Sequence, residues 1–210
     1  MSHLVSSMQF GDLDVSFDDR VLSPREWTMA QSEWAADLMQ EAPAGTVLEL
    51  FAGVGHIGLA AVASADRPLV MVDLNPVACD FARRNVDAAG MGSRVEVREG
   101  RIDEVLDAGE TFPVIIADPP WVPSAGIGEF PDDPTIAIDG GEDGLALARV
   151  CCRVVDRHLA PAGSAVLQLG TTGQADQLDT YLADVLGSAL RVVETRTYER
   201  GVLVRLSRQA

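Results

Sequence analysis

The sequence predicts an α/β fold: a Rossmann-like, open, mostly parallel seven-stranded sheet with helices on both faces and a C-terminal antiparallel hairpin. Short apolar runs alternate with helix-periodic segments from about residue 46 onward, and a glycine-rich turn follows the first run. Two strand-like segments close the chain. With 210 residues, 47% of them hydrophobic, the chain can bury one core. We expect an N-terminal extension, 1–45, and one larger domain, 46–210.

The strands of the sheet are predicted from short apolar runs bounded by turn residues. Such runs are typical of parallel strands that are buried on both faces. The C-terminal hairpin is indicated by two segments joined through Glu199-Arg200-Gly201. The predicted strands are 46–51, 69–72, 94–97, 114–117, 165–169, 190–197 and 202–206.

Helices are predicted between these strands. Asn75 is expected to cap one of them, with Pro76 at its first position and Gly90 after its end. The predicted helices are 57–65, 76–89, 102–108, 143–159 and 175–186. Strand–helix alternation of this kind implies right-handed crossovers between parallel strands.

The first 45 residues have a different pattern. Phe10, Val15 and their apolar neighbours fall mostly at alternating positions, which predicts a short strand or hairpin. A helix is expected to open at Ser23-Pro24. Trp27 and Trp34 are seven residues apart on that helix, so we expect both to face the core.

The charge balance restricts the classes of partner. Lys and Arg number 16 against 32 Asp and Glu, which gives a net charge of −16. Such a chain repels phosphate backbones, so nucleic acid is disfavoured as a partner but not excluded. The cysteines, Cys79, Cys151 and Cys152, have neither the spacing of a disulfide framework nor that of a zinc site, so no metal is expected. No membrane-spanning run is found, and we expect a cytoplasmic protein.

A glycine-rich turn lies between the first predicted strand and helix. Gly53, Gly55 and Gly58 fit the pattern G-x-G-x-x-G, and Asp73 follows about 20 residues later, where an acid can hold ribose hydroxyls. This pattern alone fits a nicotinamide dinucleotide and an adenosyl ligand equally well. Glu49 at the end of the strand favours a cationic ligand over a pyrophosphate.

Glu49-x-x-x-Gly53-x-Gly55 followed by Asp73 resembles the binding signature of class I S-adenosylmethionine-dependent methyltransferases. The resemblance implies S-adenosyl-L-methionine as cofactor. It requires no metal, because the methyl group of a sulfonium is already activated. The implied cofactor contacts are Glu49, Phe51, Ala52, Gly53, Gly55, Asp73, Leu74, Gly100, Arg101, Ile102 and Asp118.

The motif Asp118-Pro119-Pro120-Trp121 follows the fourth predicted strand. Ligands of open α/β sheets bind beyond the carboxyl ends of the strands, so Asp118 is expected beside the glycine-rich turn. The Asp118 carboxylate and the Pro119 carbonyl can accept hydrogen bonds from a planar NH₂ group, while Trp121 packs against its flat face. The motif resembles the (Asn/Asp)-Pro-Pro-(Tyr/Phe/Trp) signature of methyltransferases that act on amide or exocyclic amino nitrogens.

Further segments resemble the release-factor glutamine methyltransferases. Val21-Leu22-Ser23-Pro24-Arg25 with Thr28 is similar to their Pro-Arg-Pro-x-Thr-Glu motif, and residues 139–145, Pro161-x-Gly163 and 167–170 also match. Pro120, Arg25 and Thr28 are therefore implied as substrate-binding residues. The family usually has Asn and Tyr where Asp118 and Trp121 stand, has an acid where Arg101 stands, and carries an N-terminal helical domain.

These patterns predict an S-adenosylmethionine-dependent methyltransferase whose acceptor is a nitrogen of a protein side chain or a small molecule. Asp118, Pro119 and Trp121 are its expected catalytic residues. The alternatives are a methyltransferase for exocyclic amines of RNA or DNA, an NAD-dependent oxidoreductase, and a non-catalytic adenosyl-binding module. The proline-rich stretch 119–139 is predicted to be a long loop, either a lid over the site or a surface loop.

Overall fold

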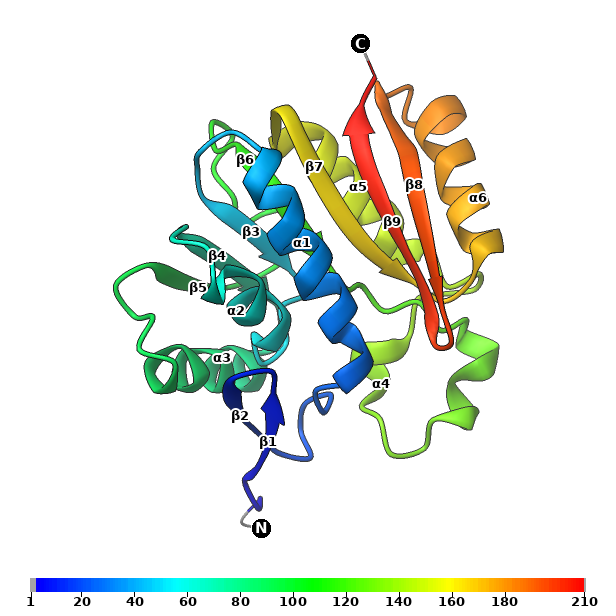
Figure 1. Ribbon diagram of the computed structural model, residues 1–210. Coiled ribbons are helices and arrows are strands. Elements are labelled where there is room, and N and C mark those ends of the chain that lie inside the picture. The colour runs from blue at the N-terminus through cyan, green and yellow to red at the C-terminus, as the bar shows by residue number, and fades with distance from the viewer. Residues whose placement is uncertain (1–2, 210) are drawn as a thin grey trace.

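A seven-stranded sheet forms the centre of the computed structural model, which describes residues 3–209 (Figure 1). The strand order is β5-β4-β3-β6-β7-β9-β8, and neighbouring strands from β5 to β7 are parallel. β9 is antiparallel to both β7 and β8. The Rossmann-like fold predicted from the sequence is therefore confirmed. The strands are β3 Val47–Leu50, β4 Leu69–Asp73, β5 Val95–Glu99, β6 Phe112–Ala117, β7 Leu159–Leu169, β8 Leu190–Tyr198 and β9 Gly201–Arg208.

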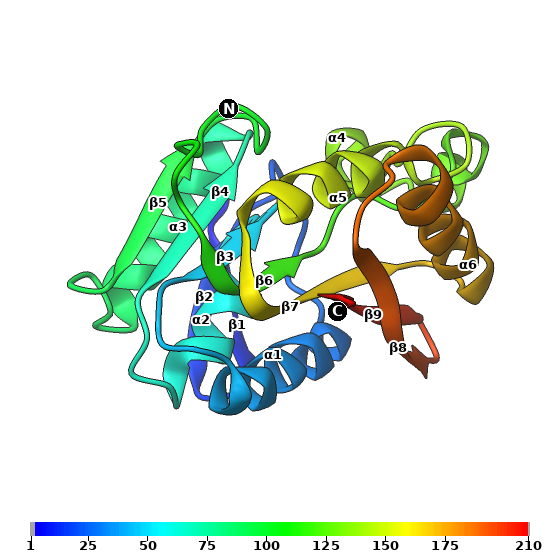
Figure 2. The same ribbon diagram turned by 90° about the horizontal axis from the view of Figure 1, so that it is seen from above.

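Helices cover both faces of the sheet (Figure 2). α1 (Met29–Glu41), α2 (His56–Ala63) and α3 (Pro76–Ala88) pack on one face, and α5 (Ala146–His158) and α6 (Thr172–Thr180) pack on the other. A π-helical turn, Tyr181–Val185, continues α6. Among residues 3–209, no helix is long and apolar enough to cross a membrane.

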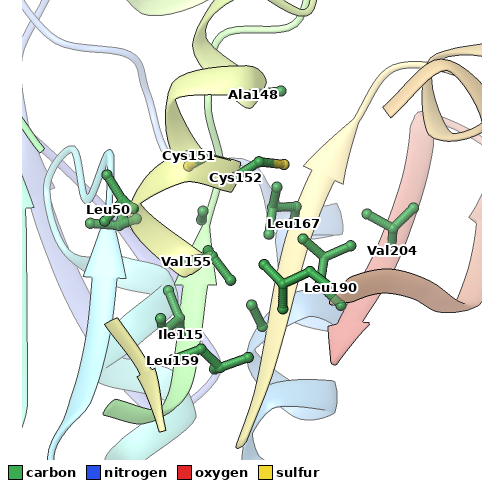
Figure 3. Close-up of a cluster of buried hydrophobic side chains, with 14 of the residues drawn as sticks. Leu50, Ile115, Ala148, Cys151, Cys152, Val155, Leu159, Leu167, Leu190 and Val204 are labelled. Atoms are coloured by element: carbon green, nitrogen blue, oxygen red, sulfur yellow. The ribbon is translucent and has the colours of Figure 1, made fainter. Parts of the chain in front are cut away.

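The core on the α5 face is built from β-branched and leucine side chains of the central strands. Cys151, Cys152 and Val155 of α5 pack against Leu167 of β7 and Ile115 of β6 (Figure 3). All six residues of β6 are buried, as expected for a strand covered on both faces. Buried apolar area of this kind is the main source of stability that holds the strand ends in place.

Local sequence signals account for helix positions. The Asn75 side chain accepts a hydrogen bond from the backbone N–H of Val77 at 3.0 Å, and Pro76 occupies the first turn of α3. Thr171 and Gln174 form a reciprocal capping box at the start of α6. The caps fix where each helix begins relative to the strand before it.

The predicted helix 102–108 is wrong, because the segment forms turns. Val105 N–H donates to the carbonyl of Arg101 at 3.0 Å, which makes one helical turn that does not continue. Ile102, Val105 and Leu106 nevertheless pack against the core. Seven residues cannot offset the cost of helix nucleation without a longer apolar face, so the segment covers the sheet edge as a turn.

The N-terminal helix begins later than predicted. Glu26–Thr28 form a 3-10 turn, and α1 starts at Met29. Trp34 is 2% exposed and packs in the core, with the Arg196 guanidinium 3.9 Å from its ring centroid. Trp27 lies on the 3-10 turn and lines a cavity, so its predicted core position is wrong.

Three segments gather at the edge of the sheet where the parallel strands end (Figure 1). They are the hairpin of β1 (Ser6–Phe10) and β2 (Leu13–Phe17), the stretch 119–139, and the β8–β9 turn. The stretch 119–139 is not a structureless loop, since it contains a 3-10 helix, Ser124–Glu129, and α4, Thr135–Ile138. The hairpin forms its own two-stranded sheet.

Candidate active site

Two adjoining cavities open at this edge, beyond the carboxyl ends of β3, β4 and β6. The first has a volume of about 1030 Å³, including its open mouth, and lies over the glycine-rich turn. The second, of about 1180 Å³, lies over the Asp-Pro-Pro-Trp motif. β3 is flanked by β4 and β6, so this is the switch point of the sheet, where ligands of open α/β folds bind. The residues that line both cavities are Leu22, Arg25, Asp118, Pro120 and Ala137.

The glycine-rich turn forms the floor of the first cavity. Gly53 and Gly55 have φ angles of +54° and +83°, and an added Cβ on Gly55 would lie 2.9 Å from the Met71 sulfur. Phe51 also has a left-handed φ, +57°, which is rare for a bulky residue. Such strain is held only where the surrounding structure fixes the backbone, and it occurs often at ligand sites.

Asp73 at the end of β4 ties the turn to the neighbouring strand. Its Oδ2 accepts a hydrogen bond from Gly53 N–H at 2.7 Å, and its Oδ1 accepts one from Asn75 N–H at 2.8 Å. Burial raises the pKa of this carboxyl, while the backbone donors act in the opposite direction. Asp73 and Leu74 both line the first cavity.

Glu49 does not line either cavity, contrary to the direct ligand contact expected from the sequence. The side chain points under the turn, where it is 2% exposed, and its Oε1 accepts a hydrogen bond from Gly58 N–H at 2.9 Å. Its Oε2 is buried and has no partner in the described part of the chain. The carboxyl therefore holds the start of α2. Burial raises its pKa to about 8.

The raised pKa of Glu49 predicts a pH-dependent stability. The folded state keeps the proton up to about pH 8, whereas the unfolded chain releases it near its ordinary pKa of 4.5. The folded state therefore binds more protons between these values, and stability falls as the pH rises through that window. Glu49→Gln should remove this contribution to the slope of the free energy of unfolding against pH. Denaturant melts at pH 5, 6.5 and 8 test it, and an unchanged slope would contradict the prediction.

Gly100, Arg101 and Ile102 also lie outside both cavities, although the resemblance implied cofactor contacts there. The exposed Arg101 guanidinium pairs with its neighbours Asp103 and Glu104. Ile102 is 6% exposed and faces the core. Gly100 N–H donates a hydrogen bond to the Asp73 carbonyl at 2.9 Å, so this residue helps to fix the end of β4.

Asp118 lies on the wall shared by the two cavities. Within residues 3–209 its carboxylate accepts no hydrogen bond and forms no ion pair. Burial alone raises its pKa to about 7. The strand end before it is fixed, because the Gln31 amide donates to the carbonyls of Ala117 at 2.9 Å and Val166 at 3.2 Å. Pro119 and Pro120 are buried beside it, which restricts the backbone.

Trp121 forms a wall of the second cavity. An added Cβ on Gly170 would lie 2.4 Å from Cε3 of Trp121, so the indole packs directly against the Gly170 backbone. The Trp121 carbonyl accepts a hydrogen bond from the Gln174 amide at 3.0 Å and lies against Gly144. The ring position is therefore set by β7, α6 and the Gly140–Gly144 turn together.

The N-terminal segment contributes side chains to both cavities. Arg25 forms an ion pair with Asp133 of the stretch 119–139 at 2.5 Å, which joins two distant segments over the site. Thr28 Oγ1 donates to the Arg25 carbonyl at 2.7 Å. Its single proton is thus used, so His56 Nε2 at 3.2 Å must donate to Thr28 Oγ1. Burial lowers the pKa of His56 to about 3, so the ring is neutral at pH 7.

Sequence reasoning missed several lining residues. His56 lines the first cavity, and its position directly after Gly55 is the sequence signal for this. Ile136 and Leu147 also line the first cavity, but nothing in their local sequence marks them. The turn Glu199-Arg200-Gly201 lines the second cavity. A hairpin strand antiparallel to β7 necessarily turns at the edge where β7 ends, and this could have predicted that placement.

Comparisons with known proteins show which chains are similar to this one. Residues 33–130 match a family described as "Conserved hypothetical protein 95". The release factor glutamine methyltransferase of Rhodospirillum rubrum is 34% identical over 183 residues, covering 83% of this chain and 54% of the relative. The ribosomal protein uL3 glutamine methyltransferase of Bradyrhizobium diazoefficiens is 29% identical, covering 80% and 57%.

A solved structure gives the same fold. The ribosomal protein L11 methylase from Lactobacillus delbrueckii subsp. bulgaricus has a TM-score of 0.67 at 13% identity, covering 90% of this chain and 82% of that one. The chain spans between about half and two thirds of the length of the curated relatives it matches. The chain is therefore similar in sequence to the release factor and uL3 glutamine methyltransferases, and it shares its fold with a solved methyltransferase.

Proposed function

We propose that this chain transfers a methyl group from S-adenosylmethionine to a nitrogen acceptor on a protein side chain or a small molecule. The observation that carries the proposal is the position of Asp118 on the wall between two cavities. One cavity can hold a methyl donor and the other an acceptor, with this carboxylate between them. In this arrangement, Asp118, Pro119 and Trp121 are the catalytic residues.

The residues of the first cavity fit an adenosyl sulfonium better than a dinucleotide. Its acidic side chains, Asp73 and Asp118, suit ribose hydroxyls and a cationic ligand. The arginines that line it are both engaged, Arg20 with Asp18 and Arg25 with Asp133. A pyrophosphate would therefore find no free cation among the described lining residues.

Direct cofactor contacts are proposed for the floor and sides of the first cavity. The backbone of Gly53 lets a ligand approach the turn closely, because an added Cβ there would meet open space. Gly55 does not line the cavity, contrary to the direct contact expected from the sequence, and acts indirectly by letting the turn pack against Met71. Asp73 is fixed by two backbone donors and keeps lone pairs for the ribose hydroxyls. Phe51, Ala52 and Leu74 supply apolar surface. Glu49 acts indirectly by fixing the start of α2.

The bound cofactor supplies an activated methyl group, and the protein's task is alignment and exclusion of water. The Asp118 carboxylate and the Pro119 carbonyl accept hydrogen bonds from the acceptor nitrogen and orient its lone pair. Trp121 confines the acceptor from the side. Alignment of two reactants in this manner can contribute about 7–11 kcal/mol to barrier lowering.

A protein acceptor is supported by the names of the relatives, which methylate glutamine of a release factor or of ribosomal protein uL3. We infer that such a chain works in the cytoplasm. We also infer that residues 1–45 form a cap on the domain 46–210, since Arg25 and Thr28 contact the site. A net charge of −16 disfavours RNA or DNA. Transfer of labelled methyl to protein, RNA and metabolite fractions of a cell extract distinguishes these acceptors.

Calorimetry tests the cofactor. We expect S-adenosylmethionine to bind and NAD not to bind. Asp73→Asn should weaken binding by about 10- to 100-fold, because charge-assisted hydrogen bonds contribute about 1.5–3 kcal/mol. Asp66→Asn, an exposed substitution of the same type, is the control and should have no effect. Binding of NAD in place of S-adenosylmethionine would refute the proposed function.

A further inference from the structure

The second cavity combines a half-buried carboxylate that has no partner within the described residues, Asp118, with aromatic side chains in its wall. We propose that it selects an aliphatic amine that arrives as a cation, rather than a neutral side-chain amide, and that Asp118 is the group that recognises it. This inference rests on the proposed function, since it names the class of acceptor. The chemistry is that of a primary or secondary aliphatic amine, carried by a protein lysine or by a free small molecule.

The first argument is the uncompensated charge of Asp118. The carboxylate has no hydrogen bond or ion pair within the described residues, and it faces the space of both cavities. Arg25, which also lines both cavities, is engaged with Asp133, and Arg200 lies on an exposed turn at the second cavity. Removing a carboxylate from water is unfavourable unless a partner compensates its charge. An ammonium group supplies that compensation, whereas an amide supplies only dipoles.

The second argument is the aromatic lining. Trp27, Trp121 and Phe130 all line the second cavity. Trp121 is fixed against Gly170, so its face is held in place before any ligand binds. A cation over the face of an aromatic ring gains about 0.5–2 kcal/mol, and the gain is largest for Trp. A carboxylate with several aromatic faces is a recognised way to hold an alkylammonium group.

The third argument is the charge of the whole molecule. A net charge of −16 draws cations toward the site and repels anions. Around the second cavity, Asp133 is paired with Arg25, and Glu199 is adjacent to Arg200, so these charges balance and Asp118 leaves the lining with a net negative charge. A basic segment of a protein, or a free amine, is therefore favoured in its approach over a neutral or acidic segment.

The reaction of such an acceptor balances with Asp118 as proton acceptor. The ammonium passes one proton to the carboxylate, and the freed nitrogen lone pair forms a bond to the methyl carbon. The carbon–sulfur bond breaks with its electrons remaining on sulfur. The products are a methylammonium, S-adenosylhomocysteine and a protonated Asp118, which returns its proton to water. Burial raises the pKa of Asp118 to about 7, close to the value that favours proton transfer at neutral pH.

Other titratable groups surround Asp118 and bear on any pH profile. From the strands and turns that pack around it, the charged or titratable neighbours are Glu49, His56, Asp73, Cys151, Arg25, Asp133, Glu199 and Arg200. Glu49 and Cys151 have pKa values raised by burial, to about 8 for Glu49 and well above 9 for Cys151. His56 is neutral above about pH 3. Asp118 and Glu49 are the members of this set whose raised pKa values lie near neutral pH, and of these two only Asp118 lines the cavities.

Binding of model compounds tests the inference without turnover. Nα-acetyl-lysine methylamide, Nα-acetyl-glutamine methylamide and n-butylamine are titrated into the full chain by NMR, with and without S-adenosylhomocysteine. At pH 8 we expect the lysine probe to bind at least about tenfold more tightly than the glutamine probe. Its affinity should fall about tenfold between pH 8 and pH 6, as Asp118 becomes protonated. Asp118→Asn should abolish both the preference and the pH dependence.

Glu129→Gln is the control, because it removes one exposed carboxylate of the stretch 119–139 that lines neither cavity. It should change the affinity for the lysine probe by less than about threefold, as expected of an exposed charge in water. If butylamine binds as well as the lysine probe, the site is assigned to small amines. If butylamine binds more weakly, the site is assigned to a lysine of a peptide. Either result supports an aliphatic amine as the acceptor.

Equal or tighter binding of the glutamine probe overturns the inference, and so does failure of every probe to bind. Labelled methyl recovered on a glutamine amide overturns it too. Failure of the proposed function has a different signature, since S-adenosylmethionine would then not bind in calorimetry whatever the amine probes do.

Discussion

Asp118→Ala is expected to lower methyl-transfer turnover by about 10²–10³-fold, as removal of a single group that stabilises developing charge does in other enzymes. The affinity for S-adenosylmethionine should change by less than about tenfold, because Gly53, Gly55 and Asp73 remain in place. The physical reason is that Asp118, on the wall between the cavities, orients the acceptor nitrogen and accepts its proton, so its loss leaves the nitrogen misaligned and protonated. Single-turnover kinetics with labelled cofactor, together with calorimetry, measure the two effects separately.

Replacing the Asp118 carboxylate with an uncharged side chain should not destabilise the fold. Asp118 is ionised at a cost in the folded state, since burial raises its pKa from 3.8 to about 7. The folded state therefore binds more protons between these values, and this carboxylate lowers stability increasingly as the pH rises from 3.8 to 7. Asp118→Asn should be more stable than wild type at pH 8 and similar to it at pH 4.

Asp132→Ala, an exposed change on the stretch 119–139, is the control for turnover. Wild-type turnover in Asp118→Ala would contradict the assignment of Asp118 as a catalytic residue.

Gly58→Ala is expected to cause the largest loss of stability. A Cβ at this position would lie 2.2 Å from Glu49 Oε2 and 3.1 Å from Leu69 Cδ2. Glu49 is fully enclosed, so it cannot move aside without breaking its hydrogen bond to Gly58 N–H. Overpacking costs about 1–3 kcal/mol and a broken buried hydrogen bond about 1–3 kcal/mol more. For a chain of this size the melting temperature should fall by roughly 4–24 °C, at about 2–4 °C per kcal/mol.

A double-mutant cycle identifies the cause. If the clash with Glu49 is responsible, Glu49→Ala should remove most of the penalty of Gly58→Ala, with a coupling energy of about 0.5–3 kcal/mol. Gly109→Ala is the matched control, because no atom lies within 4 Å of its added Cβ. Additive effects of the two substitutions would show that Glu49 is not the obstacle. Because Glu49 holds the start of α2, cofactor binding should weaken in parallel with stability.

The sequence was sufficient where a single local signal fixes an element. Val114–Ala117 is apolar throughout and Ala165–Leu169 is apolar except for Gln168, and such short runs are buried strands in an alternating α/β pattern. Asn75-Pro76 sets the start of α3 through its cap. The glycine-rich turn and the Asp-Pro-Pro-Trp motif both follow strands, and parallel strands end at one edge, so their proximity was predictable too.

The errors arise where an orientation depends on neighbours distant in sequence. Trp27 and Trp34 share a spacing that predicts one face, but the chain enters α1 through a 3-10 turn, so Trp27 turns toward the second cavity. The stretch 119–139 contains turn-forming prolines and glycines, yet the Arg25–Asp133 pair and the hydrogen bond from Val122 N–H to the Ile138 carbonyl order it over the site. Neither contact is visible in the local pattern.

By itself, the sequence determined the fold class, the position of the glycine-rich turn and the residue types of the candidate site. Hydrophobic periodicity, helix caps and motif spacing carry this information, because each acts within a short stretch of chain. The tertiary structure alone decided that Glu49 lies beneath the turn and that Asp118 has no partner within residues 3–209. Both outcomes depend on which groups fold to within a few ångströms of a carboxylate. That distance is set by the packing of the whole sheet and cannot be read along the chain.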